Sequence, residues 1–280
     1  MIEGQEGVTW PQWLALARAA EDAGLEGLFR SDHYLSIVRG GEAGSLDAWA
    51  TLAGLAAVTS KIRLGTMVSP ATFRRVPVLA KMAVTVDHIS NGRVELGLGA
   101  GWFEAEHRVY GFGFPPARER NAELDRQLAE VTRHWTEAAD IWPKPVQRPR
   151  PPIIVGGRAH PGTIRAAIAY ADEYNTPFPS VDDARERRRI VDEAARSAGR
   201  EPLRFSIMTS CVVGRDEADV RDRLARFRER TRSDGPAIAG TLEQVAEQLD
   251  RYEGAGVERF MLQHMVHEDV EMVQLLGELA

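Results

Sequence analysis

The fold class is decided by the segment from Ile62 to Trp102, IRLGTMVSPATFRRVPVLAKMAVTVDHISNGRVELGLGAGW. Its first residues, 62–68, alternate between the two faces of an extended chain, which is the period of a β-strand. Pro77 suits the first turn of a helix, and apolar residues then recur at helical spacing up to Ile89. The segment therefore begins as a strand and continues as an amphipathic helix.

A second strand follows this helix. Asn91-Gly92 supplies the left-handed stop, and the strand that begins at Val94 runs out into Gly99-Ala100-Gly101. Two strands joined by a crossover helix form a parallel unit. The carboxyl ends of the two strands must then open on one face, and that face is where we expect chemistry.

The rest of the chain repeats this alternation of short strands and helices. We expect strands near residues 28, 65, 96, 154, 174, 208 and 261, with Met1-Ile2 as the remnant of one more. The pattern predicts an α/β fold, a TIM-like (β/α)8 barrel with insertions, formed by residues 1–280 as a single domain. A doubly wound open sheet is the alternative. Four residues before the turn at Gln5 are few for a barrel strand, which favours an open or distorted barrel there.

Composition fits one enzyme-sized unit. The 280 residues are 44% apolar, and 35 basic against 41 acidic residues give a formal charge of −6, which disfavours nucleic acid or an anionic membrane as partner. No apolar run reaches the ~20 residues of a membrane span. The lone cysteine, Cys211, precedes Val212-Val213, so we expect it to pack in the core. Because a single cysteine cannot form an internal disulfide, we expect a reducing compartment such as the cytoplasm.

Asp32-His33 is the first candidate for chemistry, because it follows a short strand directly. A histidine at the mouth of a barrel, polarised by a neighbouring carboxylate, can donate or accept a proton near neutral pH. A histidine that only closes a strand end by hydrogen bonds is the alternative, and the residues alone do not separate the two.

The glycine-rich stretch from Glu95 to Gly101 is the second candidate. It fails the dinucleotide fingerprint because Trp102 stands where glycine or alanine is required. A methyltransferase motif is a distant alternative, since two or three β/α units precede the stretch. We expect these glycines to let a flat ring approach the backbone.

Two further loops follow strands. Gly156-Gly157-Arg158 precedes a helix at Pro161 and offers amides and a cation to an anion, although an ordinary loop has the same sequence features. His264 and His267 follow the last strand, but no third ligand has matching spacing. We therefore expect no metal.

Taken together, four segments resemble the luciferase-like monooxygenase superfamily: AAEDAGLEGLFRSDHY, KIRLGTMVSPATFRR, PVLAKMAVTVDHISNGRVELGLGAGW and PPIIVGG. The resemblance is strongest to the branch of oxidoreductases that use the deazaflavin coenzyme F420. It implies a barrel that is usually a homodimer and binds F420, or alternatively FMN, at the carboxyl ends of its strands. The substrate would be a small molecule.

The resemblance also implies roles for individual residues. Asp32 and His33 match residues beside the reacting edge of the ring, with His33 as proton carrier or anion stabiliser, and Met67-Val68 matches a bulge with a cis peptide bond. Residues expected to contact substrate are Tyr34, Trp102 and His264. Residues expected to contact the coenzyme are Asp32, His33, Thr66, Met67, Val68, Gly99, Gly101, Gly156, Gly157 and Arg158.

The chain departs from the family pattern in two places. Its first strand is almost absent, and Trp102 stands where several F420 enzymes have a catalytic glutamate, with Glu104 and Glu106 nearby. Glu3 and Glu6, in the first loop, are further candidates to face the cavity. Three functions are therefore compared: an F420-dependent oxidoreductase, an FMN-dependent monooxygenase, and a non-catalytic flavin-binding relative.

Overall fold

A parallel β-sheet forms the centre of the molecule. The computed structural model describes residues 1–38, 43–136, 138 and 140–279. Its strands are β1 (Gly27–Arg30), β2 (Arg63–Thr66), β3 (Ser69–Pro70), β4 (Val94–Gly99), β5 (Ile153–Gly156), β6 (Glu173–Pro177), β7 (Arg204–Gly214), β8 (Ile238–Thr241) and β9 (Arg259–Gln263). Neighbours along the sheet run β1-β2-β4-β5-β6-β7-β8, with β3 on β4 and β9 on β7, and every pairing is parallel.

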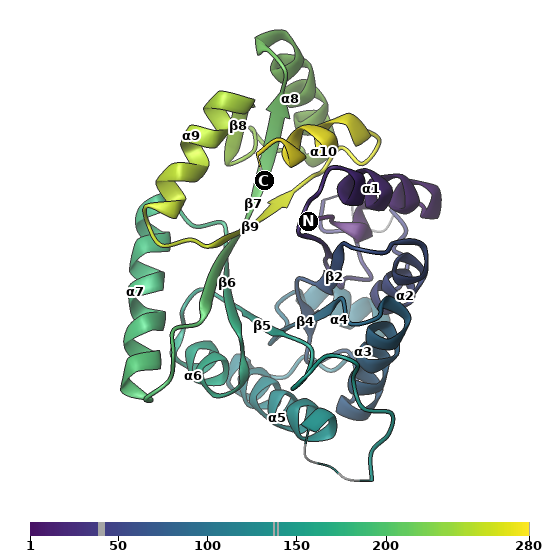
Figure 1. Ribbon diagram of the computed structural model, residues 1–280, viewed down its shortest axis with the longest axis vertical. Helices are drawn as coiled ribbons and strands as arrows, with labels where there is room; N and C mark the ends of the chain where they lie inside the picture. Colours follow the sequence, from purple (N-terminus) through teal and green to yellow (C-terminus); the bar gives the residue numbers. More distant parts are fainter. Residues whose placement is uncertain (39–42, 137, 139, 280) are drawn as a thin grey trace.

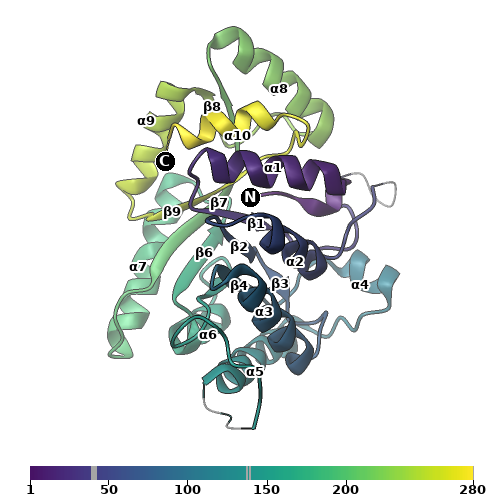
Figure 2. The ribbon, with the colours of Figure 1, turned by 45° about the vertical axis from the view of Figure 1, so that its right-hand side comes forward.

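Helices surround these strands (Figure 1). They are α1 (Trp10–Asp22), α2 (Ala48–Val58), α3 (Val76–Ser90), α4 (Glu104–Tyr110), α5 (Ala117–Thr136), α6 (Pro161–Tyr170), α7 (Val181–Ser197), α8 (Glu217–Thr231), α9 (Leu242–Glu253) and α10 (Val270–Gly277), with a 3-10 turn, η1 (Gly4–Glu6). Short α4 stands off one side of the barrel, clear of α2, α3 and α5 (Figure 2). Among the described helices none is both long and apolar enough to cross a membrane.

The barrel is closed by a single residue where the sequence favoured an opening. Ile2 forms parallel bridges to Arg30 on one side and to His264 on the other. Its amide donates to Phe29 O at 2.9 Å, and His264 N donates to Met1 O at 3.0 Å. Ile2 thus acts as the eighth strand, and the prediction of a TIM-like barrel with a truncated first strand is confirmed. Of the two alternatives expected here, an open or a distorted barrel, the structure shows a closed barrel whose first strand is reduced to single bridges.

Side chains fill the barrel in layers, as in other closed barrels. At the amino end, Arg259 Nη1 donates to Glu95 at 2.8 Å and to Glu173 at 2.9 Å, and all three side chains are buried. An apolar layer covers them; it contains Phe29, Met67, Ile154 and Met261, with the half-buried Met1, Val68 and Met208 packed on it. The carboxyl end above this layer is the expected site.

The central segment folds largely as the sequence indicates. Asn91 ends α3 in the left-handed conformation at φ 55°. The first strand is shorter than 62–68, because β2 ends at Thr66 and the chain then turns through a cis Met67–Val68 peptide bond before β3. Cys211 lies in the core on β7, where burial raises the pKa of its thiol to about 12, in agreement with a packing role.

Candidate active site

The carboxyl ends of the parallel strands share one face, which we call the mouth. β1 delivers Asp32 and His33 to it, the cis bond after β2 delivers Val68, β4 leads to Trp102, and β5 leads to Arg158. Because all strands run the same way, these residues lie at the same end of the barrel although up to 126 positions separate them in sequence. The structure therefore brings the three predicted loops to one end of the barrel.

His33 is held by a glutamate that is distant in sequence. Its Nδ1 lies 2.9 Å from Glu106 Oε2, and the Glu106 side chain is fully buried. The other carboxylate oxygen, Oε1, accepts the backbone N–H groups of Tyr34 and Leu35. Helix α4 thus fixes both the histidine ring and the chain that follows it, and leaves Nε2 as the ring nitrogen not bonded to Glu106.

Glu106 is the main group that raises the pKa of His33. Burial disfavours the imidazolium, but the hydrogen bond and charge of Glu106, with the charges of Glu3 and Asp32, raise the pKa of His33 above its usual value of 6.5. The sequence pointed to Asp32 as the polarising neighbour. That expectation is wrong, because Glu106 makes the hydrogen bond and Asp32 contributes only at longer range.

Asp32 belongs instead to a buried ionic cluster. It accepts a hydrogen bond from Ser69 Oγ at 2.6 Å and two from the Arg74 guanidinium at 2.5 and 3.2 Å. Arg74 also donates to Asp47 at 2.8 Å and to the Tyr34 hydroxyl at 3.0 Å. The cluster ties the ends of β1 and β3 to α2, so it supports the mouth from the side.

Val68 covers the glycines that were expected to admit a flat ring. A Cβ on Gly99 would lie 2.7 Å from Val68 Cγ2, and one on Gly156 would lie 3.2 Å from Cγ1. A Cβ on Gly97 would lie 2.0 Å from the backbone carbonyl oxygen of Thr66, so the close approach of the β2 backbone requires this glycine. Gly99 and Gly156 therefore make room for Val68, so a ring that approached these two glycines would contact Val68 first.

Arg158 is the predicted anion-binding residue that the structure leaves available. It is exposed and makes no hydrogen bond or ion pair with any residue that the structure describes. The N–H group of Gly157 is not available to a ligand, because it donates to Asn175 O at 2.9 Å. A Cβ on Gly157 would lie 3.0 Å from Thr163 Oγ1, so this position also needs a glycine for packing. Amides near the start of α6 and the Arg158 side chain are the remaining donors for an anion.

Aromatic side chains form another wall. The Trp102 ring lies edge-on to His33 with centroids 5.9 Å apart, stacks on Phe103 at 5.3 Å, and is 62% exposed. Tyr34, also expected near substrate, packs on Phe73 at 5.3 Å and joins the Arg74 cluster. Trp102 is therefore exposed beside His33, whereas Tyr34 packs behind the mouth.

Three other predicted residues are engaged elsewhere. The Thr66 hydroxyl is buried and donates to Gly97 O at 2.9 Å. Gly101 adopts φ 80° beside Thr72. His264 is fully buried 6.3 Å from the His267 ring, and burial lowers its pKa to about 3. Its neighbour Gln263 points into the barrel, so His264 points to the helix layer and not into the mouth.

The two glutamates of the first loop have different surroundings. Glu6 accepts from Ser36 Oγ at 2.6 Å and from the amide of Ile37 at 2.8 Å, so it holds the loop after β1. Glu3 is buried inside the mouth, where it accepts from Gln5 at 2.7 Å and from Gln263 at 2.5 Å. Of the two, Glu3 is the one whose charge acts on His33.

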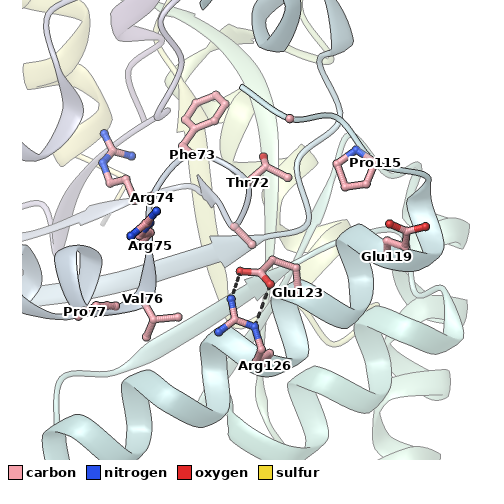
Figure 3. A pocket seen from close by; sticks show the side chains of 12 residues that line it. Thr72, Phe73, Arg74, Arg75, Val76, Pro77, Pro115, Glu119, Glu123 and Arg126 are labelled. Atoms are coloured by element: carbon pink, nitrogen blue, oxygen red, sulfur yellow. Dashed lines mark hydrogen bonds and ion pairs between the residues drawn. The ribbon is translucent and has the colours of Figure 1, made fainter. Parts of the chain in front are cut away.

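A groove of about 640 Å³ lies beside the segment 71–77 and the start of α5 (Figure 3). Its floor carries the ion pair between Glu123 and Arg126, and Phe73 and Thr72 project away from that pair (Figure 3). Neither His33 nor Glu106 lines it. The groove is thus separate from His33 and Glu106, although Arg74 both lines the groove and binds Asp32.

Comparison with known proteins identifies the family. The sequence model of the luciferase-like monooxygenase family matches residues 2–234, so the chain belongs to this family. An uncharacterised protein of Mycobacterium tuberculosis is 33% identical over 198 residues, 66% of each chain. An F420-dependent glucose-6-phosphate dehydrogenase of Amycolatopsis mediterranei is 37% identical over 119 residues, 42% of this chain and 35% of that enzyme. The match to the Mycobacterium tuberculosis protein spans just under two thirds of that protein's length.

Solved structures support the same fold. The coenzyme F420-dependent tetrahydromethanopterin reductase of Methanopyrus kandleri superposes with a TM-score of 0.79 at 18% identity, covering 99% of this chain and 96% of that one. A type II Baeyer–Villiger monooxygenase component of Pseudomonas putida, in complex with FMN, superposes with a TM-score of 0.75 at 16% identity. The superposition covers 96% of this chain and 91% of that one. The resemblance expected from the sequence is confirmed, and both coenzymes occur among the neighbours.

Proposed function

We propose that this chain is an F420-dependent oxidoreductase that moves a hydride between the deazaflavin and a small organic substrate. The observation that carries the proposal is the buried His33–Glu106 pair at the mouth, beside the apolar surface made by Val68. Relatives that use F420, including the Amycolatopsis enzyme, favour this coenzyme. When bound, the deazaflavin would supply the hydride chemistry that no side chain can supply.

The residues of the mouth fit a planar ring with a phosphorylated tail. Val68, Met208 and Met1 present a half-buried apolar surface on which a ring can rest. Arg158 is a cation without a protein partner among the described residues, at the end of β5 and three positions before α6 begins. It would bind the phosphate, while His33, on the β1 side, would hold a proton at Nε2 for the substrate.

A histidine variant tests this assignment. His33→Ala should abolish turnover while coenzyme affinity stays within about tenfold, or ~1.4 kcal/mol, because the ring rests on Val68 and its tail on Arg158. Glu104→Gln, an exposed substitution on the same helix as Glu106, is the matched control and should keep full turnover. Undiminished turnover in His33→Ala would remove His33 from the mechanism.

An FMN-dependent monooxygenase is the second candidate. The FMN complex of the Pseudomonas protein favours it, because FMN shares a planar tricyclic ring and a phosphate with F420. Titration of the purified protein with the two coenzymes separates the candidates. Closure of the barrel by Ile2 removes the observation that had favoured a non-catalytic relative.

We also propose that the protein acts as a homodimer in the cytoplasm. Helix α2, AWATLAGLAAV, has apolar residues around most of its circumference. A helix of this kind is usually buried on its outer side as well, here by a second subunit. Its outer face borders an apolar groove of about 540 Å³ shared with α3, where Val78 is half exposed. Val78→Glu should convert a dimer to a monomer in sedimentation velocity, whereas Glu104→Gln should not.

A further inference from the structure

We infer that the site acts on an uncharged, largely apolar ring compound held between Trp102 and Phe178, and not on an anion such as a sugar phosphate. The inference rests on the proposed function for the place of the coenzyme. It goes beyond that function, because hydride transfer to or from F420 does not fix the charge or polarity of the substrate. The exposed aromatic side chains and the charges at the mouth carry it.

Phe178 stands at the carboxyl end of the strand opposite β1. Around the closed barrel the order is β1, β2, β4, β5, β6, β7, β9 and Ile2, so β6 lies four positions from β1 in either direction. β1 leads to His33, and β6 ends at Pro177, directly before Phe178. A ligand that reacts beside His33 therefore has the loop of Phe178 across the mouth from it.

The backbone of Phe178 is held in a conformation that bulky residues rarely adopt. Its φ is 45°, in the left-handed region. Its N–H donates to Met208 O at 2.7 Å, and the carbonyl oxygen of Pro179 accepts from the Tyr252 hydroxyl at 3.0 Å. Strain that the surroundings fix in this way is typical of ligand-binding sites, so we assign Phe178 to the site.

Aromatic surface at the mouth is left uncovered. The Phe178 side chain is 50% exposed and joins no apolar cluster among the described residues. Trp102 is 62% exposed, with its ring centroid 5.9 Å from that of His33. Met208 continues this surface into the barrel, where it packs on the apolar layer. A ring compound that covered these side chains would remove apolar surface from water, which favours its binding.

The charges around His33 disfavour an anionic substrate. Those that act on its ring come from the acids Glu106, Glu3 and Asp32. An anion placed beside His33 would be close to these carboxylates, and like charges repel each other strongly where water is excluded. A substrate anion would thus need a cation of its own at this place.

The cations of the same region are already engaged by the protein. Arg74 is bound to Asp32. The Arg30 guanidinium and the Met1 ammonium, whose interactions with Glu3 act at longer range, each donate to a main-chain carbonyl oxygen. None of these three cations is therefore free to bind a phosphate or a carboxylate of the substrate.

Arg158 is free, but the proposed function assigns it to the phosphate of the coenzyme. The lysines of the chain lie away from the mouth: Lys61 precedes β2, Lys81 is on α3, and Lys144 lies in the segment before β5. A sugar phosphate needs a second anion site beside that of the coenzyme, with its own charged donors. The described part of the chain offers no such site next to His33, so an uncharged substrate fits better.

The first test compares two matched ligands by calorimetry with protein loaded with oxidised F420, which cannot reduce a ketone. We expect 4-methylcyclohexanone to bind at least tenfold more tightly than 4-oxocyclohexanecarboxylate, which has a carboxylate in place of the methyl group. Glucose 6-phosphate, the substrate named for the Amycolatopsis relative, should give no turnover with oxidised F420. Equal or tighter binding of the carboxylate, or turnover of glucose 6-phosphate, would overturn the inference.

The second test removes the two aromatic side chains. Trp102→Ala and Phe178→Ala should each weaken 4-methylcyclohexanone by about tenfold, or ~1.4 kcal/mol. Ile89→Ala, at a 44% exposed position on α3, is the control and should leave affinity unchanged. Phe178→Gly accepts φ 45° without strain, so it should bind as weakly as Phe178→Ala and unfold at a higher temperature. Unchanged affinity in both aromatic variants, or an equal loss in Ile89→Ala, would overturn the inference.

Failure of the proposed function is distinguishable from failure of this inference. If F420 does not bind, the proposed function fails, and the two cyclohexane ligands are titrated into the coenzyme-free protein. A preference for the uncharged ligand that Phe178→Ala abolishes still supports the inference there. Binding of neither ligand to either form of the protein overturns it.

Discussion

Arg74 is the residue whose loss should destabilise the site most. Its side chain is 8% exposed and makes four hydrogen bonds, two to Asp32, one to Asp47 and one to Tyr34. Arg74→Met keeps the length of the side chain and removes the charge. Asp32, 1% exposed, would then be a buried charge without its partner, a change that costs ~3–5 kcal/mol.

The other carboxylate adds little to this cost. The Asp47 side chain is 34% exposed, and pairs of that kind contribute ~0–1 kcal/mol. The expected loss of about 3–5 kcal/mol is a large part of the ~5–15 kcal/mol by which domains are stable. Urea unfolding followed by circular dichroism measures it directly.

Two companion variants identify the cause. Arg74→Lys keeps the charge but not the two parallel bonds to Asp32, so it should lose about 1–2 kcal/mol. Asp32→Asn combined with Arg74→Met should recover ~0.5–3 kcal/mol relative to Arg74→Met alone, because the uncompensated charge is gone. A loss below about 1 kcal/mol in Arg74→Met, or strict additivity of the two substitutions, would refute this reasoning.

Three further predictions concern the mouth. Gly99→Ala should weaken coenzyme binding in a spectroscopic titration, because the new Cβ would lie 2.7 Å from Val68 Cγ2 and must displace that side chain. Arg158→Ala should weaken FMN binding by ~5–100-fold, as expected for loss of a charge-assisted bond, and leave riboflavin binding unchanged, whereas Arg165→Ala, on the following helix α6, should affect neither. His33 has a folded pKa above 6.5, so its contribution to stability is full below pH 6.5 and is lost as pH rises through the folded pKa. The difference in unfolding free energy between the parent and His33→Gln should therefore shrink with rising pH, and a constant difference would contradict this.

The barrel could be predicted because its signals are local. Alternation of short apolar strands with helices is visible within windows of a dozen residues, and Pro77 and Asn91 mark the two ends of α3. Closure could not be predicted, because Ile2 completes the sheet with single bridges and a lone residue has no periodic pattern. Strand β8 was also missed, since its sequence IAGT has only two apolar residues before Gly240 and leads directly into the helix that begins at Leu242.

The site was predictable only in part, because its pairings join distant parts of the chain. His33 was found because it follows a strand, but its partner Glu106 is 73 residues away on a seven-residue helix. Nothing in EAEHRVY marks its third residue as buried, although the sequence did place two acids near Trp102. The glycines at 99 and 156 were conspicuous, but only the folded chain shows that they accommodate Val68.

The central claim is that one planar redox coenzyme binds at the mouth, between Val68, His33 and Arg158. Parallel titrations of the purified protein with F420 and with FMN, followed by absorbance, test it most directly. We expect saturable binding of F420 that is tighter than binding of FMN and is weakened by Arg158→Ala. Failure of both coenzymes to bind, or F420 binding that Gly99→Ala and Arg158→Ala leave unchanged, would contradict it.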